Sequence, residues 1–249
     1  MSKTEKIVRI TGTAVCELFT AATIIMLLFN KQYNRLPLAI ITLFIIFVPL
    51  VTEKIFRCKI SLPVYIFTIC YFTGPMLGQC YNLYYLLSWW DKMLHILGGV
   101  LFSLFGIFLF ERFSGSTKKR LLFTAVFALC FSVTVSALWE FAEFGADVFS
   151  GTDMQHDTVV TSINSYLLGN GIGVVGSIGD IIEVVINGRP LPFNGYIDLG
   201  LIDTMLDMLL EAQGSVAILA VYLIDKGKHP AFIQSKGDKN KPFQKTKAG

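Results

Sequence analysis

Carboxylates and one histidine stand near the ends of three long apolar segments of this 249-residue sequence. A carboxylate at the end of a membrane-crossing helix is costly unless it faces water, another polar group or a metal ion. The repeated placement therefore predicts a polar functional site. In chain order, the residues concerned are Asp91, His95, Glu140, Glu143, Asp147, Asp203, Asp207 and Glu211.

The spacing within each segment places these side chains on one helix face. Asp91 and His95 lie about 40° apart around a helix that turns about 100° per residue. The acids of the other two segments fall within arcs of about 60° and about 80°. Such polar stripes should turn toward the interior of a helix bundle, where all three could meet in one pocket.

Carboxylates that meet in one pocket need a counter-charge or a proton. Carboxylate ligation with a single His favours Mg²⁺, Mn²⁺ or Ca²⁺ and also allows Zn²⁺. Protonated carboxylates would instead suit proton-coupled transport. The predicted catalytic residues are Asp91, His95, Glu140 and Glu143. The predicted metal ligands are these four residues together with Asp147, Asp203 and Asp207.

The composition indicates the kind of protein that positions these residues. Hydrophobic residues make up 53% of the chain and charged residues 16%, against about 25% charged residues in soluble domains. Apolar runs near the length of about 20 residues that a membrane-crossing helix needs predict an all-α, polytopic bundle of about six helices. The runs cover residues 7–29, 36–51, 62–87, 93–110, 121–144 and 201–224. Pro75 predicts a kink in the third run.

Lys and Arg predict the orientation in the membrane. With six helices, 17 of the 21 basic residues fall on the side of both termini, and only Lys31, Arg35, Lys92 and Arg189 fall on the other. The positive-inside rule then predicts that both termini lie in the cytoplasm and that the acidic clusters lie at the outer face. The basic cytoplasmic face suits anionic lipid head groups. No nucleic-acid recognition motif accompanies it.

The predicted domains are a transmembrane helical domain, residues 1–225, and a basic, disordered cytoplasmic tail, residues 226–249. An outer loop insertion at 148–200 interrupts the helical domain. Within it, Asn187-Gly188 between β-prone residues predicts a hairpin turn. Glu17, deep in the first segment, is an intramembrane acid that either belongs to a functional site or makes a structural hydrogen bond to a neighbouring helix. The five cysteines have no zinc or disulfide spacing.

At the polar clusters the chain resembles a family. The segment Trp-Asp-Lys-Met-Leu-His at 90–95 resembles the Asp-Lys-x-x-His signature of YjdF-like bacterial inner-membrane proteins. Further similar elements are Trp-Glu-x-x-Glu at 139–143, Gly-Thr-Asp-x-Gln at 151–155 and Asp-Thr-x-x-Asp at 203–207. The first element alone is also similar to VanZ-like membrane proteins. The YjdF-like resemblance implies a multi-helix membrane fold, with the last two elements close together, although residues 157–200 separate them here; it implies no particular reaction.

Three functions remain open from the sequence. A metal-assisted hydrolase or transferase acting on a lipid or envelope component would use the acid and His cluster at the outer face. A proton- or cation-coupled transporter would use the carboxylates as ion sites and need a polar path across the bilayer. A membrane scaffold or accessory protein would use the polar side chains to join its helices.

Overall fold

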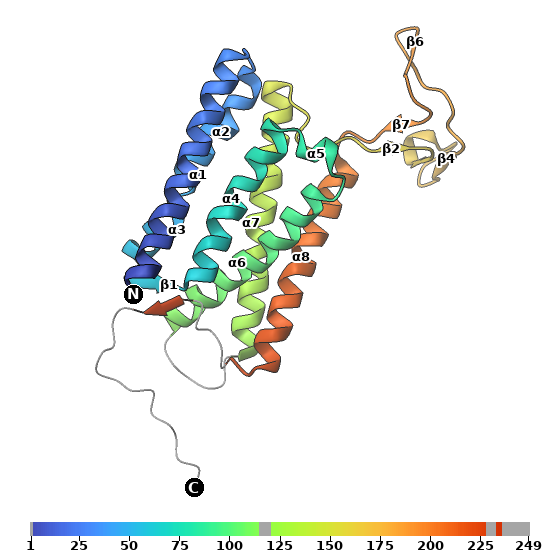
Figure 1. Ribbon diagram of the computed structural model, residues 1–249. Coiled ribbons are helices and arrows are strands. Elements are labelled where there is room, and N and C mark those ends of the chain that lie inside the picture. The colour runs from blue at the N-terminus through green and yellow to red at the C-terminus, as the bar shows by residue number, and fades with distance from the viewer. Residues whose placement is uncertain (1, 115–120, 228–232, 236–249) are drawn as a thin grey trace. The chain divides into compact units, whose positions relative to one another are not determined.

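The computed structural model describes residues 2–114, 121–227 and 233–235 (Figure 1). Helices dominate these ranges. The α-helices are α1 (Lys3–Phe29), α2 (Leu36–Ile45), α3 (Val48–Ile55), α4 (Leu62–Cys80), α5 (Leu83–Leu86), α6 (Trp90–Ser114), α7 (Leu121–Ser150) and α8 (Leu201–Ile224). Short 3-10 turns stand at Tyr33–Arg35 and Tyr166–Leu168.

The helices confirm the predicted polytopic membrane bundle. Within the described ranges, five stretches are long and apolar enough to cross a membrane: α1, α2 with α3, α6, α7 and α8. The helix α4 adds a further 19 residues of helix. The predicted sixth segment coincides with α8, whereas α6 and α7 extend a few residues beyond their predicted ends. Spans of this kind imply that the protein lies in a lipid bilayer.

The chain divides into two compact units, residues 1–136 with 210–249 and residues 137–209, so that α7 and α8 each contribute to both. In the first unit, α4 packs against α1, α2 and α6, and these helices run side by side in Figure 1. More than half of the apolar stretch of α6 is buried (56%), against 22 to 28% in the other four spans. The helix α6 therefore lies inside the bundle and can carry polar side chains away from lipid.

The second predicted segment is corrected in one respect. It was expected as a single helix over 36–51, but the structure breaks it into α2 and α3 and continues it to Ile55. Pro49 stands in the first turn of α3. Since proline has no N–H and its ring clashes with the carbonyl four residues before it, the helix is interrupted just ahead of this residue. In contrast, α4 continues through Pro75.

A buried ion pair joins the elements at one end of the first unit. Arg9 of α1 donates to Glu53 of α3 at 2.6 Å, and both side chains are buried. Arg9 also donates to the Ile60 carbonyl, while the Ile60 amide donates to Glu53 at 2.8 Å. Lys59 adds a second cation 3.0 Å from Glu53. The charge count predicted Arg9 and Lys59 on the side of the termini but did not predict this pairing with Glu53.

The backbones of α6 and α8 touch where both carry glycine. A Cβ on Gly99 would overlap the carbonyl oxygen of Glu211, and a Cβ on Gly214 would overlap that of Ile96. Small residues that let helix backbones meet are typical of membrane helix contacts. This contact fixes the height of Glu211 against His95, which lies one turn before Gly99 on α6.

The second unit contains the insertion between α7 and α8. Short antiparallel strands form it: β2 (Val159–Val160) pairs with β7 (Tyr196–Ile197), β3 (Ile163–Ser165) with β4 (Gly176–Ile178), and β5 (Val185–Ile186) with β6 (Arg189–Pro190). The predicted hairpin is confirmed, because Asn187 and Gly188 link β5 to β6 with φ of 51° and 77°. Two positive φ values are those of a type I′ turn.

The C-terminal tail is described only in part. Strand β8 (Ile233–Ser235) pairs antiparallel with β1 (Cys58–Ile60), so that Ile60 lies opposite Ile233. The predicted disorder of the tail concerns mainly residues 228–232 and 236–249, which lie outside the described residues.

Candidate functional site

The candidate site is centred on His95, a buried side chain of α6. Its Nε2 atom lies 3.7 Å from Asp91 Oδ1, and its Nδ1 atom lies 3.9 Å from Glu211 Oε2. The imidazole thus stands between two carboxylates from two helices. Both separations exceed the length of a hydrogen bond. They leave room for a proton relay through small movements, or for a cation on the Asp91 side.

Glu211 is held by hydroxyl groups. Ser132 of α7 lies 3.2 Å from Glu211 Oε1 and 2.9 Å from the hydroxyl of Ser215, one turn further along α8. The Gly99 carbonyl oxygen lies 3.2 Å from the Ser215 hydroxyl. Both serines are buried. Because a buried polar group that is hydrogen-bonded keeps its position, the serines fix the Glu211 carboxylate beside His95.

A fourth helix closes the site. Tyr71 of α4 points its hydroxyl to the surface of α6 at Gly98, where a Cβ would lie only 2.6 Å from the Tyr71 oxygen and 3.3 Å from Glu211 Oε2. Gly98 therefore leaves space for a phenol and a carboxylate together. The sequence offered a Gly-Gly pair after His95 as the only sign of this close approach.

The site lies toward one end of the first unit. Trp90, at the start of α6, donates its indole N–H to the Gly74 carbonyl in the second half of α4 at 3.2 Å. The ion pair of Arg9 and Glu53 adjoins Ile60, which precedes the start of α4. The cluster around His95 and the buried ion pair thus lie near opposite ends of α4.

An apolar cluster follows the serines toward the other end of α6, α7 and α8. It consists of Ile107, Ala125, Ala128 and Leu219. Ala128 lies one helical turn from Ser132, and Leu219 lies one turn from Ser215. The series of polar side chains that starts at Asp91 and His95 therefore ends at Ser132 and Ser215, next to this buried apolar cluster.

The second unit gives Asp147 and Asp203 a structural task. Asp147, near the end of α7, accepts the Thr152 hydroxyl at 2.7 Å and the amides of Met154 and Gln155 at 2.7 and 2.9 Å. Asp203, near the start of α8, accepts the His156 amide at 3.1 Å. Both predicted metal ligands therefore anchor the segment that leaves α7, and their predicted role as ligands stays a prediction.

The insertion returns to the place from which it departs. The Gln155 side-chain amide donates to the Thr204 hydroxyl at 2.5 Å, and Asp198 accepts the amides of Thr158 and Ile202, each at 2.7 Å. The Gly-Thr-Asp-x-Gln and Asp-Thr elements are therefore adjacent, as the family resemblance implied. The residues between the two elements form a long loop whose ends are joined by the pairing of β2 with β7.

The acids of this segment affect one another. Partial burial, followed by the charges of Asp153, Asp198 and Asp147, raises the pKa of Asp157, which His156 opposes. Asp157 is itself exposed. Several carboxylates lie close together here because they accept hydrogen bonds from backbone N–H groups, and their mutual repulsion is the electrostatic cost of that arrangement.

Three further predicted site residues lie in the second unit, and all are buried. Glu140 and Glu143 of α7 are 3% and 8% exposed, and Asp207 of α8 is 3% exposed. Burial agrees with the predicted inward stripes on these helices. The predicted convergence of the whole set on a single metal-binding pocket stays a prediction. Glu17 on α1 keeps Oε1 buried with no hydrogen-bond partner among the described residues.

The helices and the buried polar site define a multi-pass membrane protein. The chain belongs to a family described as "Predicted membrane protein (DUF2238)", whose model matches residues 12–227. That match is consistent with the YjdF-like resemblance, whereas nothing supports the resemblance to VanZ-like proteins. Neither the curated proteins nor the solved structures contain a match to this chain.

Proposed function

We propose that the protein is a cation-dependent hydrolase or transferase acting at the outer face of the bacterial inner membrane. The observation that carries the proposal is the position of His95 between Asp91 and Glu211. A separation of 3.7 Å between Asp91 Oδ1 and His95 Nε2 suits two ligands of one cation at about 2.0–2.2 Å each. Glu211, on the other ring nitrogen, corresponds to the carboxylate that orients a metal-bound imidazole.

The chemistry follows from that arrangement. A divalent cation on Asp91 and His95 would lower the pKa of a bound water and polarise an ester or amide carbonyl, or a phosphoryl oxygen. Asp91 is partly exposed, with 22% of its side chain accessible, whereas the His95 and Glu211 side chains are 8% and 4% exposed. The cation would therefore face the interface on its Asp91 side, where lipid head groups and envelope components lie.

The orientation is part of the proposal. By the positive-inside rule, the distribution of basic residues favours a cytoplasmic location for both chain termini. The helix α6 runs from Trp90 to Ser114, with Asp91 in its first turn and Arg112 in its last turn, so we assign the site at its start to the opposite, outer side. The apolar cluster of Ile107, Ala125, Ala128 and Leu219 below the serines favours a one-sided site over an ion-coupled carrier.

Metal analysis of the purified protein tests the proposal. We expect about one divalent ion per chain, lost on dialysis against a chelator, and loss of that ion in Asp91→Asn and His95→Ala. Glu211→Gln should weaken metal affinity about 10- to 100-fold, because it removes only the orienting carboxylate. The matched control is Glu111→Gln at the other end of α6, where the carboxylate accepts the Tyr222 hydroxyl.

Two outcomes would contradict the proposal. The first is a well-folded protein that binds no divalent ion at any divalent-ion concentration at which the bacterial cells grow. The second is equal loss of metal in Glu111→Gln and Asp91→Asn, which would mean that binding depends on net charge and not on this site. Thermal unfolding of each variant in detergent separates loss of the site from loss of the fold.

A further inference from the structure

An apolar cleft lies in the first unit, and His95 is not among the residues that line it. Its cavity volume is about 160 Å³, and residues of α3, β1, α4, α6 and α7 line it. On α4 the lining extends from Val64 to Phe72, which corresponds to about 12 Å at 1.5 Å per residue. The cleft is therefore elongated along the helix axis, the direction in which acyl chains lie in a bilayer.

The residues that line the cleft favour an apolar ligand. Thr52 and Thr68 are its only polar side chains, in a lining that otherwise includes Leu101, Phe105 and Val135. The Thr68 hydroxyl donates to the Val64 carbonyl at 2.7 Å, so it needs no further partner. A cleft lined almost entirely by apolar side chains favours an apolar occupant over water or a polar ligand.

Positive charge stands at one end of the cleft. Thr52 and Ile60 line that end, and Lys54 and Arg57, between them in the sequence, are both exposed. The neighbouring carboxylate of Glu53 is already engaged by Arg9 and Lys59. Neither Lys54 nor Arg57 has an acidic partner within the described part of the chain. Their charges are therefore uncompensated at the level where α3 ends.

We propose that this cleft binds one anionic phospholipid, with an acyl chain along α4 and the phosphate beside Lys54 and Arg57. Charge complementarity selects the head group, since each basic residue near a membrane surface attracts anionic lipid. The elongated shape and apolar lining of the cleft select the acyl chain. This site is separate from the proposed cation site, and its existence does not depend on the reaction at His95.

The test uses the full-length protein in detergent, exchanged against mixed phosphatidylglycerol and phosphatidylcholine, with bound lipid measured by native mass spectrometry. We expect about one phosphatidylglycerol per chain and little phosphatidylcholine. The Lys54→Gln/Arg57→Gln variant should lose at least about tenfold in retained phosphatidylglycerol. Leu104→Trp, which fills the cleft from α6, should lose both lipids.

The matched control is Lys3→Gln/Lys6→Gln, which removes two exposed cations of α1 and changes net charge equally. Its lipid retention should equal that of the unaltered protein. Equal loss in the control, equal retention of both lipids, or a lipid-free dimer that covers the cleft would each overturn the proposal. Because Lys54 and Arg57 are exposed, the Lys54→Gln/Arg57→Gln variant should remain folded. It therefore tests the proposal even if the Leu104→Trp variant unfolds.

Discussion

Arg9 shows at the level of a single residue how a charge can be placed inside this protein. Its guanidinium donates to Glu53, Glu5 and the Ile60 carbonyl and lies 4.7 Å from the centre of the Tyr65 ring. Four elements of the first unit therefore share one side chain. Arg9 is therefore not a surface cation: its side chain connects α1, α3, β1 and α4.

We predict that Arg9→Met costs about 3–5 kcal/mol of stability, because it leaves the buried Glu53 carboxylate uncompensated. The double variant Arg9→Met/Glu53→Gln should recover much of that loss. Lys59→Met, at a side chain that is 31% exposed, should cost about 1 kcal/mol or less. Unfolding in detergent followed by intrinsic fluorescence measures all three. Equal costs for Arg9→Met and Lys59→Met would show that the buried pair has no special weight.

At the scale of elements, the contact between α6 and α8 positions the candidate site. His95 and Glu211 lie on different helices, and their separation depends on how closely the two backbones approach at Gly99 and Gly214. Serines on α7 and α8 then join the same contact. A change that parts these helices should therefore disturb the site without altering any of its polar groups.

We predict that Gly214→Ala lowers stability by about 1–3 kcal/mol, because its Cβ must displace the Ile96 carbonyl. It should also weaken metal binding, if the cation lies where we propose. The control is Gly145→Ala on α7, where the nearest atom to a Cβ is 4.0 Å away; this change should be neutral or slightly stabilising. The midpoint of thermal unfolding is the measurement. An unchanged midpoint in Gly214→Ala would mean that the helices separate freely.

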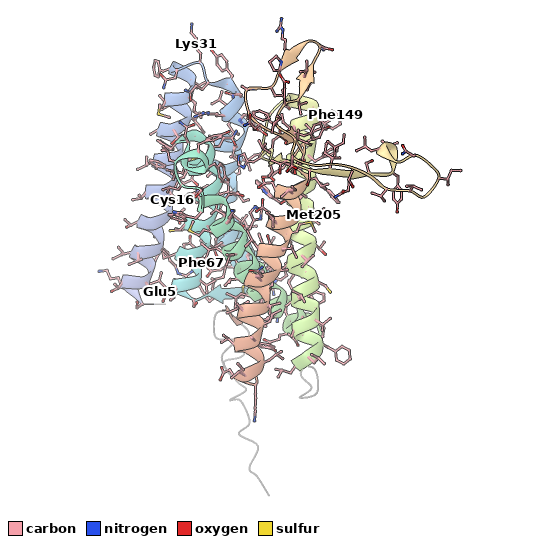
Figure 2. All side chains as sticks on the ribbon, turned by 90° about the vertical axis from the view of Figure 1, so that its right-hand side faces the viewer. Glu5, Cys16, Lys31, Phe67, Phe149 and Met205 are labelled. Carbon is pink, nitrogen blue, oxygen red and sulfur yellow. The ribbon has the colours of Figure 1, made fainter. Side chains whose placement is uncertain are left out.

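At the scale of the whole molecule, the topology decides which compartment the site meets. Figure 2 shows Glu5 and Lys31 at opposite ends of α1, with Cys16 between them. Under the positive-inside rule, 17 of the 21 basic residues predict a cytoplasmic location for the Glu5 end, provided that α4 crosses the membrane like the five more apolar spans. The orientation thus depends on a helix whose own hydropathy is weaker.

We predict that Lys31→Cys is labelled by a membrane-impermeant maleimide on intact cells, and that Lys6→Cys is labelled only after permeabilisation. Both positions are exposed. The background must lack the native cysteines, all five of which are free and two of which, Cys70 and Cys130, are exposed. The reverse labelling pattern would invert the topology and move the candidate site to the cytoplasmic face.

The sequence by itself determined the membrane class, nearly all helix segments, the polar faces of three helices and the turn at Asn187-Gly188. These features depend on hydropathy, helical period and backbone preference, which are local properties of the chain. Pro49 interrupts the second predicted segment. The third predicted segment, 62–87, ends as a helix at Cys80, before Asn82 with its left-handed φ of 59°.

Only the tertiary structure decided which polar groups meet. It placed Glu211, Ser132 and Tyr71 around His95 and joined Gln155 to Thr204 across the insertion. It also paired Arg9 with Glu53, 44 residues away. Such partners come from different helices, and backbone contact at glycines sets their heights relative to one another. No local pattern encodes that height, because it results from packing several helices at once.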